Sequence, residues 1–476
     1  MNQLLKVGIG LLIINVLFSC EKKVHDEPFK VEVRKKIYPG NGQPSYLGDW
    51  ELMDTQTLDH LDLNKLKTTK LDKYGGEIEQ KFESTGYFRT QKIDGRWWII
   101  DPLGHKYIHK AVNSINKGKS DRNKEAFRTL YATTSNWMEA TADLLWQNGF
   151  NGMGSWSNYK AIQTNNSEKG THISYTVNLS LMGKYGKKRG GTYAVPGHLG
   201  YPNNAPFIFD KGFEEFCFEF VKNELPKYKN DDNLLGYFTD NEMPFKRNIL
   251  DGYLKNDPSD EGYIAAKNWL EENSISKGEI DDAIRDQFLA YTISTYMEVV
   301  TNAIKAVDPN HLILGIRLYT SEKNNESFMT AYGKYVDVVS VNYYHRWTPK
   351  QEEMNDWEKW TQKPFMITEW YTKSDDTGLP NNAGAGWVVK TQNDRGLFYQ
   401  NYTLGLMKNK NCVGWHWFKY IDNDPTMKNA ELSNTDSNKG IIDYKYEPYQ
   451  DLMIKMKDLN ERVYALIQSF DQESNI

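Results

Sequence analysis

Apolar and polar positions along the chain first follow strand spacing and then alternate between strand and helix spacing. Residues 86–93 and 96–100 are predicted as two strands around Asp94-Gly95, a pair that is typical of a tight hairpin turn. From Tyr107 onward, short apolar runs alternate with segments of helical periodicity. These runs predict eight further strands, at residues 106–113, 149–155, 173–181, 235–239, 311–318, 336–343, 365–368 and 413–418.

Helical periodicity appears in most of the connections between these strands. The predicted helices cover residues 137–147, 213–225, 283–307, 395–407 and 451–467. Repeated strand–helix units indicate parallel strands, and eight of them predict an α/β fold, a (β/α)8 TIM barrel with an N-terminal β-hairpin extension. A doubly wound open sheet is the alternative. It usually carries a glycine-rich loop after its first strand, whereas residues 113–116 are Asn-Ser-Ile-Asn.

Three connections are longer than a minimal barrel needs, at residues 183–206, 246–282 and 371–394. Loops of this length are usually functional or partly disordered. Each of them follows the C-terminal end of a predicted strand, and barrel enzymes carry their active sites at that face. The three segments are therefore predicted to lie on the side of the barrel that carries the site.

The N-terminal residues have the pattern of an export signal. Lys6 precedes an apolar run from Val7 to Phe18, which is too short to span a membrane, and Leu17-Phe18-Ser19-Cys20 resembles a bacterial lipoprotein cleavage box. We therefore expect a lipid on Cys20 and a protein anchored to the outer membrane, on its periplasmic or cell-surface side. A plain signal peptide with a coincidental cysteine is the alternative. The predicted divisions are a signal peptide (1–19), a tether (20–49), an extension with the β-hairpin (50–105) and the catalytic barrel (106–476).

Composition and charge exclude several classes of protein. The 476 residues are 39% hydrophobic, which is enough for a large core, and a net charge of −5 without a long Lys/Arg run does not indicate a nucleic-acid partner. Cys217 and Cys412 do not make a disulfide framework, so we expect two buried thiols. The nine histidines are scattered along the chain, and no Gly-x-Ser-x-Gly motif occurs at 152–157. No metal or other cofactor is predicted.

Two apolar strands end in a carboxylate. Residues 235–239 lead into Asp240-Asn241-Glu242, and residues 364–368 lead into Glu369-Trp370. A lone glutamate is most often a solvated surface charge, but two that close strands on one face of a barrel suggest a pair. Glycosidic cleavage needs such a pair, because one carboxyl group protonates the leaving oxygen while the other attacks the sugar or activates water. Asn241 is placed to bond a sugar hydroxyl beside the scissile bond.

With these two strand ends, the chain resembles the clan A glycoside hydrolases and, more narrowly, glycoside hydrolase family 50, the β-agarases. The matching stretches are residues 86–89, 92–98, 101–105, 112–114, 238–242, 367–370, 376–381, 384–386 and 389–392. The resemblance implies a retaining enzyme that cleaves β-galactosidic linkages in a red-algal galactan such as agarose. It also implies that Glu242 is the acid/base and Glu369 the nucleophile.

Seven further residues complete the expected substrate site, together with Asn241. By the resemblance, Tyr343 matches a position that orients the nucleophile, and the end of the eighth strand carries a ring beneath the sugar. Trp415 and Trp417 are the candidates for that ring, and their alternation puts both on one face of the strand. The residues at the ends of strands 1, 2, 5 and 6 are candidates for binding sugar hydroxyls, and they are Asn113, Trp156, Arg317 and His345.

Two other functions stay open on the sequence. One is an exo-acting β-galactosidase on another galactan. The other is a non-catalytic, lipid-anchored glycan-binding protein, which would keep the aromatic residues but tolerate the loss of either glutamate. Because Glu242 and Glu369 are both present, an enzyme with a polysaccharide or oligosaccharide substrate is the favoured hypothesis.

Overall fold

The computed structural model describes residues 27–39, 43–190, 200–427, 430 and 434–473. The predicted signal peptide and Cys20 lie outside this range. Within it, no helix is both long enough and apolar enough to cross a membrane.

Eight parallel strands form the central sheet, and the order of the strands is that of a barrel. Neighbours follow the order β13-β12-β11-β10-β9-β18-β15-β14, and a parallel bridge between Leu318 and Val341 joins the two ends. The strands are β9 (His109–Val112), β10 (Gly152–Met153), β11 (Ser174–Asn178), β12 (Leu234–Phe238), β13 (Leu312–Gly315), β14 (Val339–Asn342), β15 (Phe365–Trp370) and β18 (Cys412–Trp417). The predicted (β/α)8 barrel is therefore confirmed, with all eight strands in the expected order.

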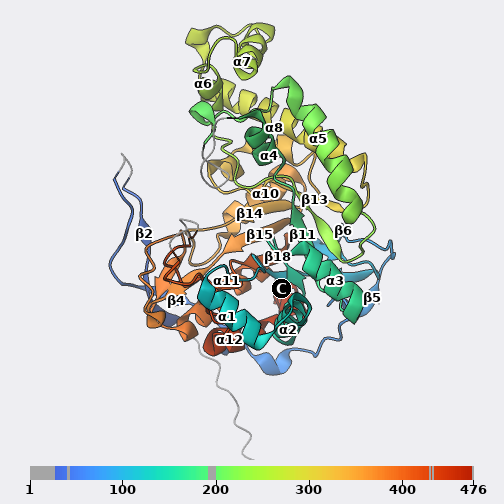
Figure 1. Ribbon diagram of the computed structural model, residues 1–476, viewed down its shortest axis with the longest axis vertical. Helices are drawn as coiled ribbons and strands as arrows, with labels where there is room; N and C mark the ends of the chain where they lie inside the picture. The colour runs from blue at the N-terminus through green and yellow to red at the C-terminus, as the bar shows by residue number, and fades with distance from the viewer. Residues whose placement is uncertain (1–26, 40–42, 191–199, 428–429, 431–433, 474–476) are drawn as a thin grey trace, which may run out of the picture.

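Helices surround this sheet (Figure 1). They are α1 (Asp121–Leu130), α2 (Thr134–Gln147), α3 (Tyr159–Lys169), α4 (Leu181–Arg189), α5 (Lys211–Glu224), α8 (Asp282–Lys305), α9 (Glu326–Tyr332), α10 (Gln351–Thr361), α11 (Gln392–Lys408), α12 (Gln450–Asn460) and α13 (Val463–Glu473). Several helices begin where the sequence supplies a capping side chain. At the start of α11, for example, Thr391 and Asp394 exchange side-chain-to-backbone hydrogen bonds in a capping box.

A four-stranded antiparallel sheet closes the base of the barrel. It consists of β5 (Glu77–Lys81), β6 (Arg89–Ile93), β7 (Arg96–Ile100) and β8 (His105–Tyr107). β6 and β7 are the predicted hairpin, and its turn residues Asp94 and Gly95 both have positive φ. Phe88, Ile99 and Tyr107 pack in one apolar cluster with the barrel residues Leu235, Leu312, Leu314, Val338, Met366 and Val413. The strand predicted at 106–113 is divided between the two sheets, because β8 pairs with β7 while β9 belongs to the barrel.

The expected tether contains structured residues, which corrects the prediction for 20–49. β1 (Phe29–Arg34) pairs with β4 (Glu51–Thr55) and with β17 (Trp387–Val389), and β16 (Thr372–Ser374) completes that sheet. A short pair, β2 (Lys36–Ile37) and β3 (Tyr46–Leu47), extends from it. Val31 and Val33 are buried while Lys30 and Glu32 are exposed, so the charges mask a half-buried strand.

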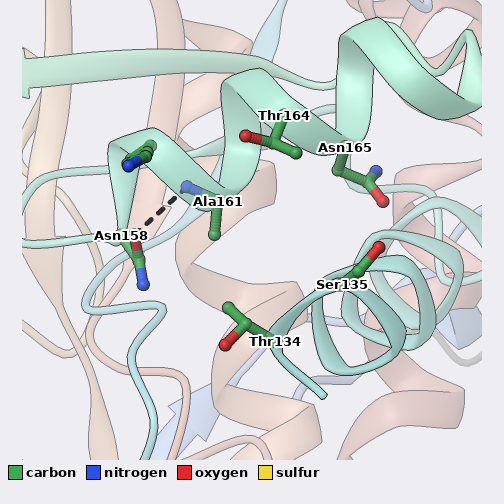
Figure 2. A pocket seen from close by; sticks show the side chains of 7 residues that line it. Thr134, Ser135, Asn158, Ala161, Thr164 and Asn165 are labelled. Carbon is green, nitrogen blue, oxygen red and sulfur yellow. Dashed lines mark hydrogen bonds between the residues drawn. The ribbon is translucent and has the colours of Figure 1, made fainter.

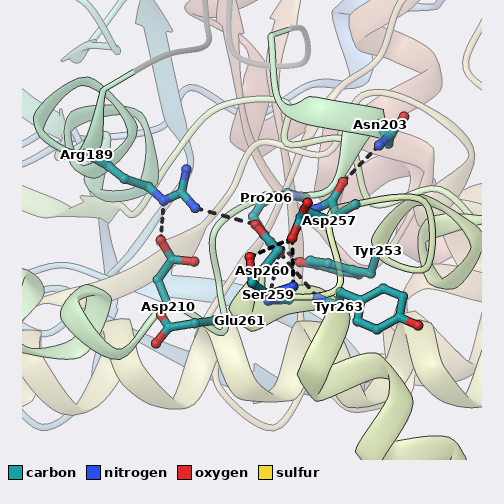
Figure 3. Close-up of polar contacts among 12 residues, drawn as sticks. Arg189, Asn203, Pro206, Asp210, Tyr253, Asp257, Ser259, Asp260, Glu261 and Tyr263 are labelled. Atoms are coloured by element: carbon teal, nitrogen blue, oxygen red, sulfur yellow. Dashed lines mark hydrogen bonds and ion pairs between the residues drawn. The ribbon is translucent and has the colours of Figure 1, made fainter.

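The long connection after β12 contains α6 (Ile249–Tyr253) and α7 (Glu261–Glu272), which lie at the end of the molecule farthest from α12 (Figure 1). Polar contacts join this insertion to α4 and to the segment before α5 (Figure 3). Arg189 forms ion pairs with Asp210 and, at 3.5 Å, with Asp260, which caps α7. The hydroxyl of Tyr253 donates to the Pro206 carbonyl at 2.6 Å. The insertion is thus a folded part of the barrel's C-terminal side.

Candidate active site

Glu242 and Glu369 lie at the C-terminal ends of parallel strands in one barrel. Glu242 follows β12, and its backbone N–H donates to the Ile316 carbonyl at 3.0 Å, which ties the turn to the end of β13. Glu369 is within the last two residues of β15. Their exposed fractions are 9% and 7%. Because all barrel strands point the same way, both carboxyl groups stand at one face.

Arg317 connects the two strand ends. It follows β13, is completely buried, and donates from Nη2 to Glu369 Oε1 at 2.7 Å and to the Thr368 carbonyl at 3.0 Å. Its other terminal nitrogen, Nη1, donates to Asn241 Oδ1 at 2.9 Å. The planar guanidinium therefore fixes the position of Glu369 relative to Asn241, the neighbour of Glu242.

The second oxygen of Glu369 has its own donor. The hydroxyl of Tyr344 donates to Oε2 at 2.6 Å. Burial and the charge of nearby Glu242 raise the pKa of Glu369, while Arg317 and the Tyr344 hydrogen bond act in the opposite direction. The bonds from Arg317 and Tyr344 thus favour the ionised carboxylate in a place where burial opposes ionisation.

Glu242 has a neutral donor. Asn342, the last residue of β14, donates from Nδ2 to Glu242 Oε1 at 2.7 Å. The hydroxyl of Thr368 donates to Asn342 Oδ1 at 2.8 Å, which leaves the amide nitrogen directed at Glu242. The environments of the two glutamates therefore differ, since a charged guanidinium bonds Glu369 and an uncharged amide bonds Glu242.

The other predicted residues at strand ends take different places. Asn113 is buried and donates from Nδ2 to the Thr368 carbonyl at 2.7 Å, so it supports β15. Trp156 is 37% exposed, and its ring centroid lies 5.7 Å from the guanidinium carbon of Arg317. His345 is exposed, with its ring centroid 5.6 Å from that of Tyr38 in the N-terminal segment.

The prediction that Tyr343 orients the nucleophile is wrong. Its hydroxyl donates to Glu353 Oε2 at 2.6 Å, and Glu353 belongs to α10. Alternation along the chain puts Tyr344, like Asn342, on the side of the glutamates, and a register shift between Val341 and Asn342 aligns Asn342 with Glu369. The same alternation, counted from Asn342, would have identified Tyr344.

Trp415 and Trp417 share one face of β18, as predicted, but that face is the outer one. The indole of Trp415 donates to the Tyr399 hydroxyl of α11 at 3.0 Å, and the indole of Trp417 donates to the Lys439 carbonyl at 3.0 Å. His416, between them, lies 2.9 Å from a ring nitrogen of His109 in β9. Neither indole is therefore directed at the glutamates, which corrects the expectation of a sugar-binding ring here.

Asn342 and Tyr344 are the residues that the sequence prediction missed. They lie at the C-terminal end of strand 6, on either side of Tyr343. Cys217 and Cys412 are free and buried, as expected.

A separate pocket of about 330 Å³ lies between α2 and α3 (Figure 2). Hydroxyl and amide side chains line much of it, including those of Thr134, Ser135, Thr164 and Asn165. No carboxyl group lines this pocket, so it does not supply the paired acids that the strand ends supply.

Comparison with known proteins finds similar sequences and similar folds. No protein-family model matches the sequence. The crystal structure of BpGH50 superposes with a TM-score of 0.81 and 33% sequence identity, and the match covers 93% of this chain and 96% of that one. The crystal structure of an agarase, AgWH50C, has a TM-score of 0.70 at 21% identity, covering 85% of this chain and 68% of that one, and this likeness is one of fold.

Curated relatives match over part of their length. Beta-agarase B of Vibrio sp. (strain JT0107) is 24% identical over 83% of this chain and 50% of its own length. Beta-agarase A of the same organism is 25% identical over 88% of this chain and 45% of its own length. The chain thus spans about half the length of the curated relatives that it matches.

Proposed function

Because the chain belongs to glycoside hydrolase family 50, we propose that it hydrolyses β-galactosidic linkages in a red-algal galactan such as agarose. The observation that carries the proposal is the pair of buried carboxyl groups at the ends of β12 and β15, held by donors of different charge. The names of the two curated relatives support agarose as the first substrate to test.

The substrate is tested by product analysis on agarose, porphyran and an aryl β-galactoside, run side by side with the wild type and with a Glu369→Gln variant as a blank. We expect oligosaccharide products from agarose that the variant does not release. Cleavage of the aryl β-galactoside or of porphyran alone would support an exo-β-galactosidase on another galactan. Binding of agarose without any cleavage would support a glycan-binding protein.

We further propose a retaining double displacement, with Glu369 as nucleophile and Glu242 as acid/base. Arg317 and Tyr344 hold both oxygens of Glu369, so the carboxylate stays ionised and oriented for attack on the anomeric carbon. Glu242 gives its proton to the leaving oxygen and then takes one from the water that hydrolyses the glycosyl-enzyme. Such an enzyme needs carboxyl groups ~5–5.5 Å apart, close enough for direct attack.

Chemical rescue separates the two roles. In Glu369→Ala the attacking atom is lost, and azide should restore activity with a glycosyl azide of inverted configuration. In Glu242→Ala only the proton is lost, so substrates with good leaving groups still react, and azide should give a product of retained configuration. Exchanged outcomes would reverse the assignment. Inversion by the wild type, seen by NMR of the first product, would contradict the double displacement.

We also propose that Cys20 carries a lipid that anchors the protein to the outer membrane. The support is the Leu17-Phe18-Ser19-Cys20 box after the apolar run from Val7 to Phe18. Cell fractionation of the wild type and a Cys20→Ala variant tests this. The wild type should be found with membranes and the variant in the soluble fraction, whereas an equal distribution of the two proteins would refute lipidation.

A further inference from the structure

Three side chains with metal-ligating atoms meet at the base of the barrel, away from the two glutamates. Asp72 precedes β5, Asp101 begins the turn between β7 and β8, and His105 begins β8. Their neighbour Tyr74 donates from its hydroxyl to Asp232, just before β12, at 2.8 Å. The cluster therefore lies at the N-terminal ends of the barrel strands, opposite the face that carries Glu242 and Glu369.

Each carboxylate uses one oxygen for its own turn. Asp72 Oδ1 accepts from the backbone N–H groups of Tyr74 and Gly76, both at 2.9 Å. Asp101 Oδ1 accepts from those of Leu103 at 2.9 Å and His105 at 3.0 Å. These bonds hold both carboxyl groups in place. The backbone of each turn therefore sets the direction in which the second oxygen, Oδ2, points.

The second oxygens and one histidine nitrogen converge. His105 Nδ1 lies 2.7 Å from Asp72 Oδ2. Asp101 is completely buried, and its Oδ2 has no hydrogen-bond donor among the described residues. The candidate ligand atoms of Asp72, Asp101 and His105 all lie within 4.8 Å of one another. A buried carboxylate oxygen without a donor, aimed at a second carboxylate, is the feature that needs an explanation.

Two facing carboxylates contain only acceptors, so a positive species between them is required for both to be satisfied. In the described part of the chain, the ion-pair partner of this group is His105, and no Lys or Arg pairs with either aspartate. The two species that satisfy the site are therefore a shared proton and a metal cation.

We propose that Asp72, Asp101 and His105 bind a divalent cation of the Zn²⁺ class. Two carboxylate oxygens and one imidazole nitrogen are ligands that Zn²⁺ accepts, and water supplies the fourth position. The charges of the two carboxylates balance those of the cation, which suits a buried site. The cation links the loop before β5 to the β7–β8 turn and so stabilises the sheet that closes the barrel. Its role is structural and is independent of the proposed hydrolysis.

The test uses untagged full-length protein and two matched variants. Asp101→Asn keeps Oδ1 for the turn and replaces Oδ2 by an amide that can donate to Asp72, so this variant folds without a cation. Asp443→Asn is the control, because Asp443 Oδ1 accepts from residues two and four positions on, Lys445 at 2.7 Å and Glu447 at 2.9 Å, outside the cluster. All three proteins are treated with EDTA, dialysed, and titrated with ZnCl₂.

Calorimetric titration and thermal unfolding are the measurements. We expect one Zn²⁺ to bind the wild type and the Asp443→Asn variant, and to raise Tm by roughly 3 °C at a hundredfold excess over Kd. In Asp101→Asn the affinity should fall at least ~10-fold and the rise in Tm should disappear. The proposal is overturned if the wild type shows no saturable binding, or if all three proteins respond alike. An EDTA-treated wild type that is unchanged by Zn²⁺, beside a more stable Asp101→Asn, would assign a shared proton instead.

Discussion

Replacing Tyr344 by phenylalanine removes one hydroxyl from the candidate active site and leaves the ring in place. That hydroxyl donates to Glu369 Oε2 at 2.6 Å, a length typical of a hydrogen bond to a charged acceptor. The bond favours the ionised form of Glu369, so its loss raises the pKa of that carboxyl group further above its ordinary value. The proposed nucleophile then loses its charge at a higher pH than in the wild type.

The size of the effect follows from the strength of the bond. A hydrogen bond to a charged group contributes about 1.5–3 kcal/mol, and 1.36 kcal/mol corresponds to one pKa unit. The acidic limb of the profile of kcat/KM against pH should therefore move upward by ~1–2 units, since activity needs ionised Glu369 and is lost as the pH falls through its pKa. On the plateau, where Glu369 is ionised in both proteins, only its positioning is affected and we expect a loss of about tenfold.

The assay is kcat/KM on an agarose oligosaccharide between about pH 4 and 9, with circular dichroism to verify that the variant is folded. Tyr343→Phe is the matched control, because its hydroxyl bonds Glu353 on α10. The control should leave the acidic limb where it is in the wild type. An unmoved limb in Tyr344→Phe, or an equal movement in Tyr343→Phe, would refute the assignment of Tyr344 to the nucleophile.

Four further changes have defined outcomes. Arg317→Lys keeps a charge but loses the guanidinium fork, and kcat/KM should fall by ~100-fold in steady-state assays. Asn342→Ala removes the amide that bonds the proposed proton donor, so kcat should fall more for aryl galactosides with poor leaving groups than for those with good ones. Tyr38 is 55% exposed beside His345, and we expect its ring to contact sugar, so Tyr38→Ala should raise KM for the polymer by ~3–10-fold with kcat little changed. Arg96→Ala removes a buried guanidinium that pairs with the partly exposed Asp471 and donates to two backbone carbonyls, and urea unfolding should show a loss of about 3 kcal/mol.

The barrel could be predicted from local pattern because every strand is a short apolar run in a β–α repeat. The face that carries the glutamates follows from the same reasoning, since parallel strands bring their C-terminal ends to one side. Glu242 and Glu369 are found at the ends of the fourth and seventh strands, as the order of the runs predicts. Arg317 is found at the end of the fifth and contacts Glu369.

The sequence pattern did not identify contacts that depend on distant partners. β1 carries alternating charges, which predict a tether, but its backbone pairs with β17, whose Val389 lies opposite Val33. The Asp72, Asp101 and His105 cluster is another case, because its members are not arranged in a metal-binding spacing along the chain. In both cases the contact comes from a residue far away in the sequence, so a local pattern does not indicate it.

The sequence by itself determined the kind of fold, the order of the strands and the two carboxylates at one end of the barrel, because periodicity and strand direction are local properties. Only the tertiary structure decided which neighbouring side chain faces the site. Tyr344 and not Tyr343 bonds Glu369, and Trp415 and Trp417 face α11. A shift of one residue in register reverses the direction of every side chain that follows, and that register is set by pairing across the barrel, which no short stretch of sequence contains.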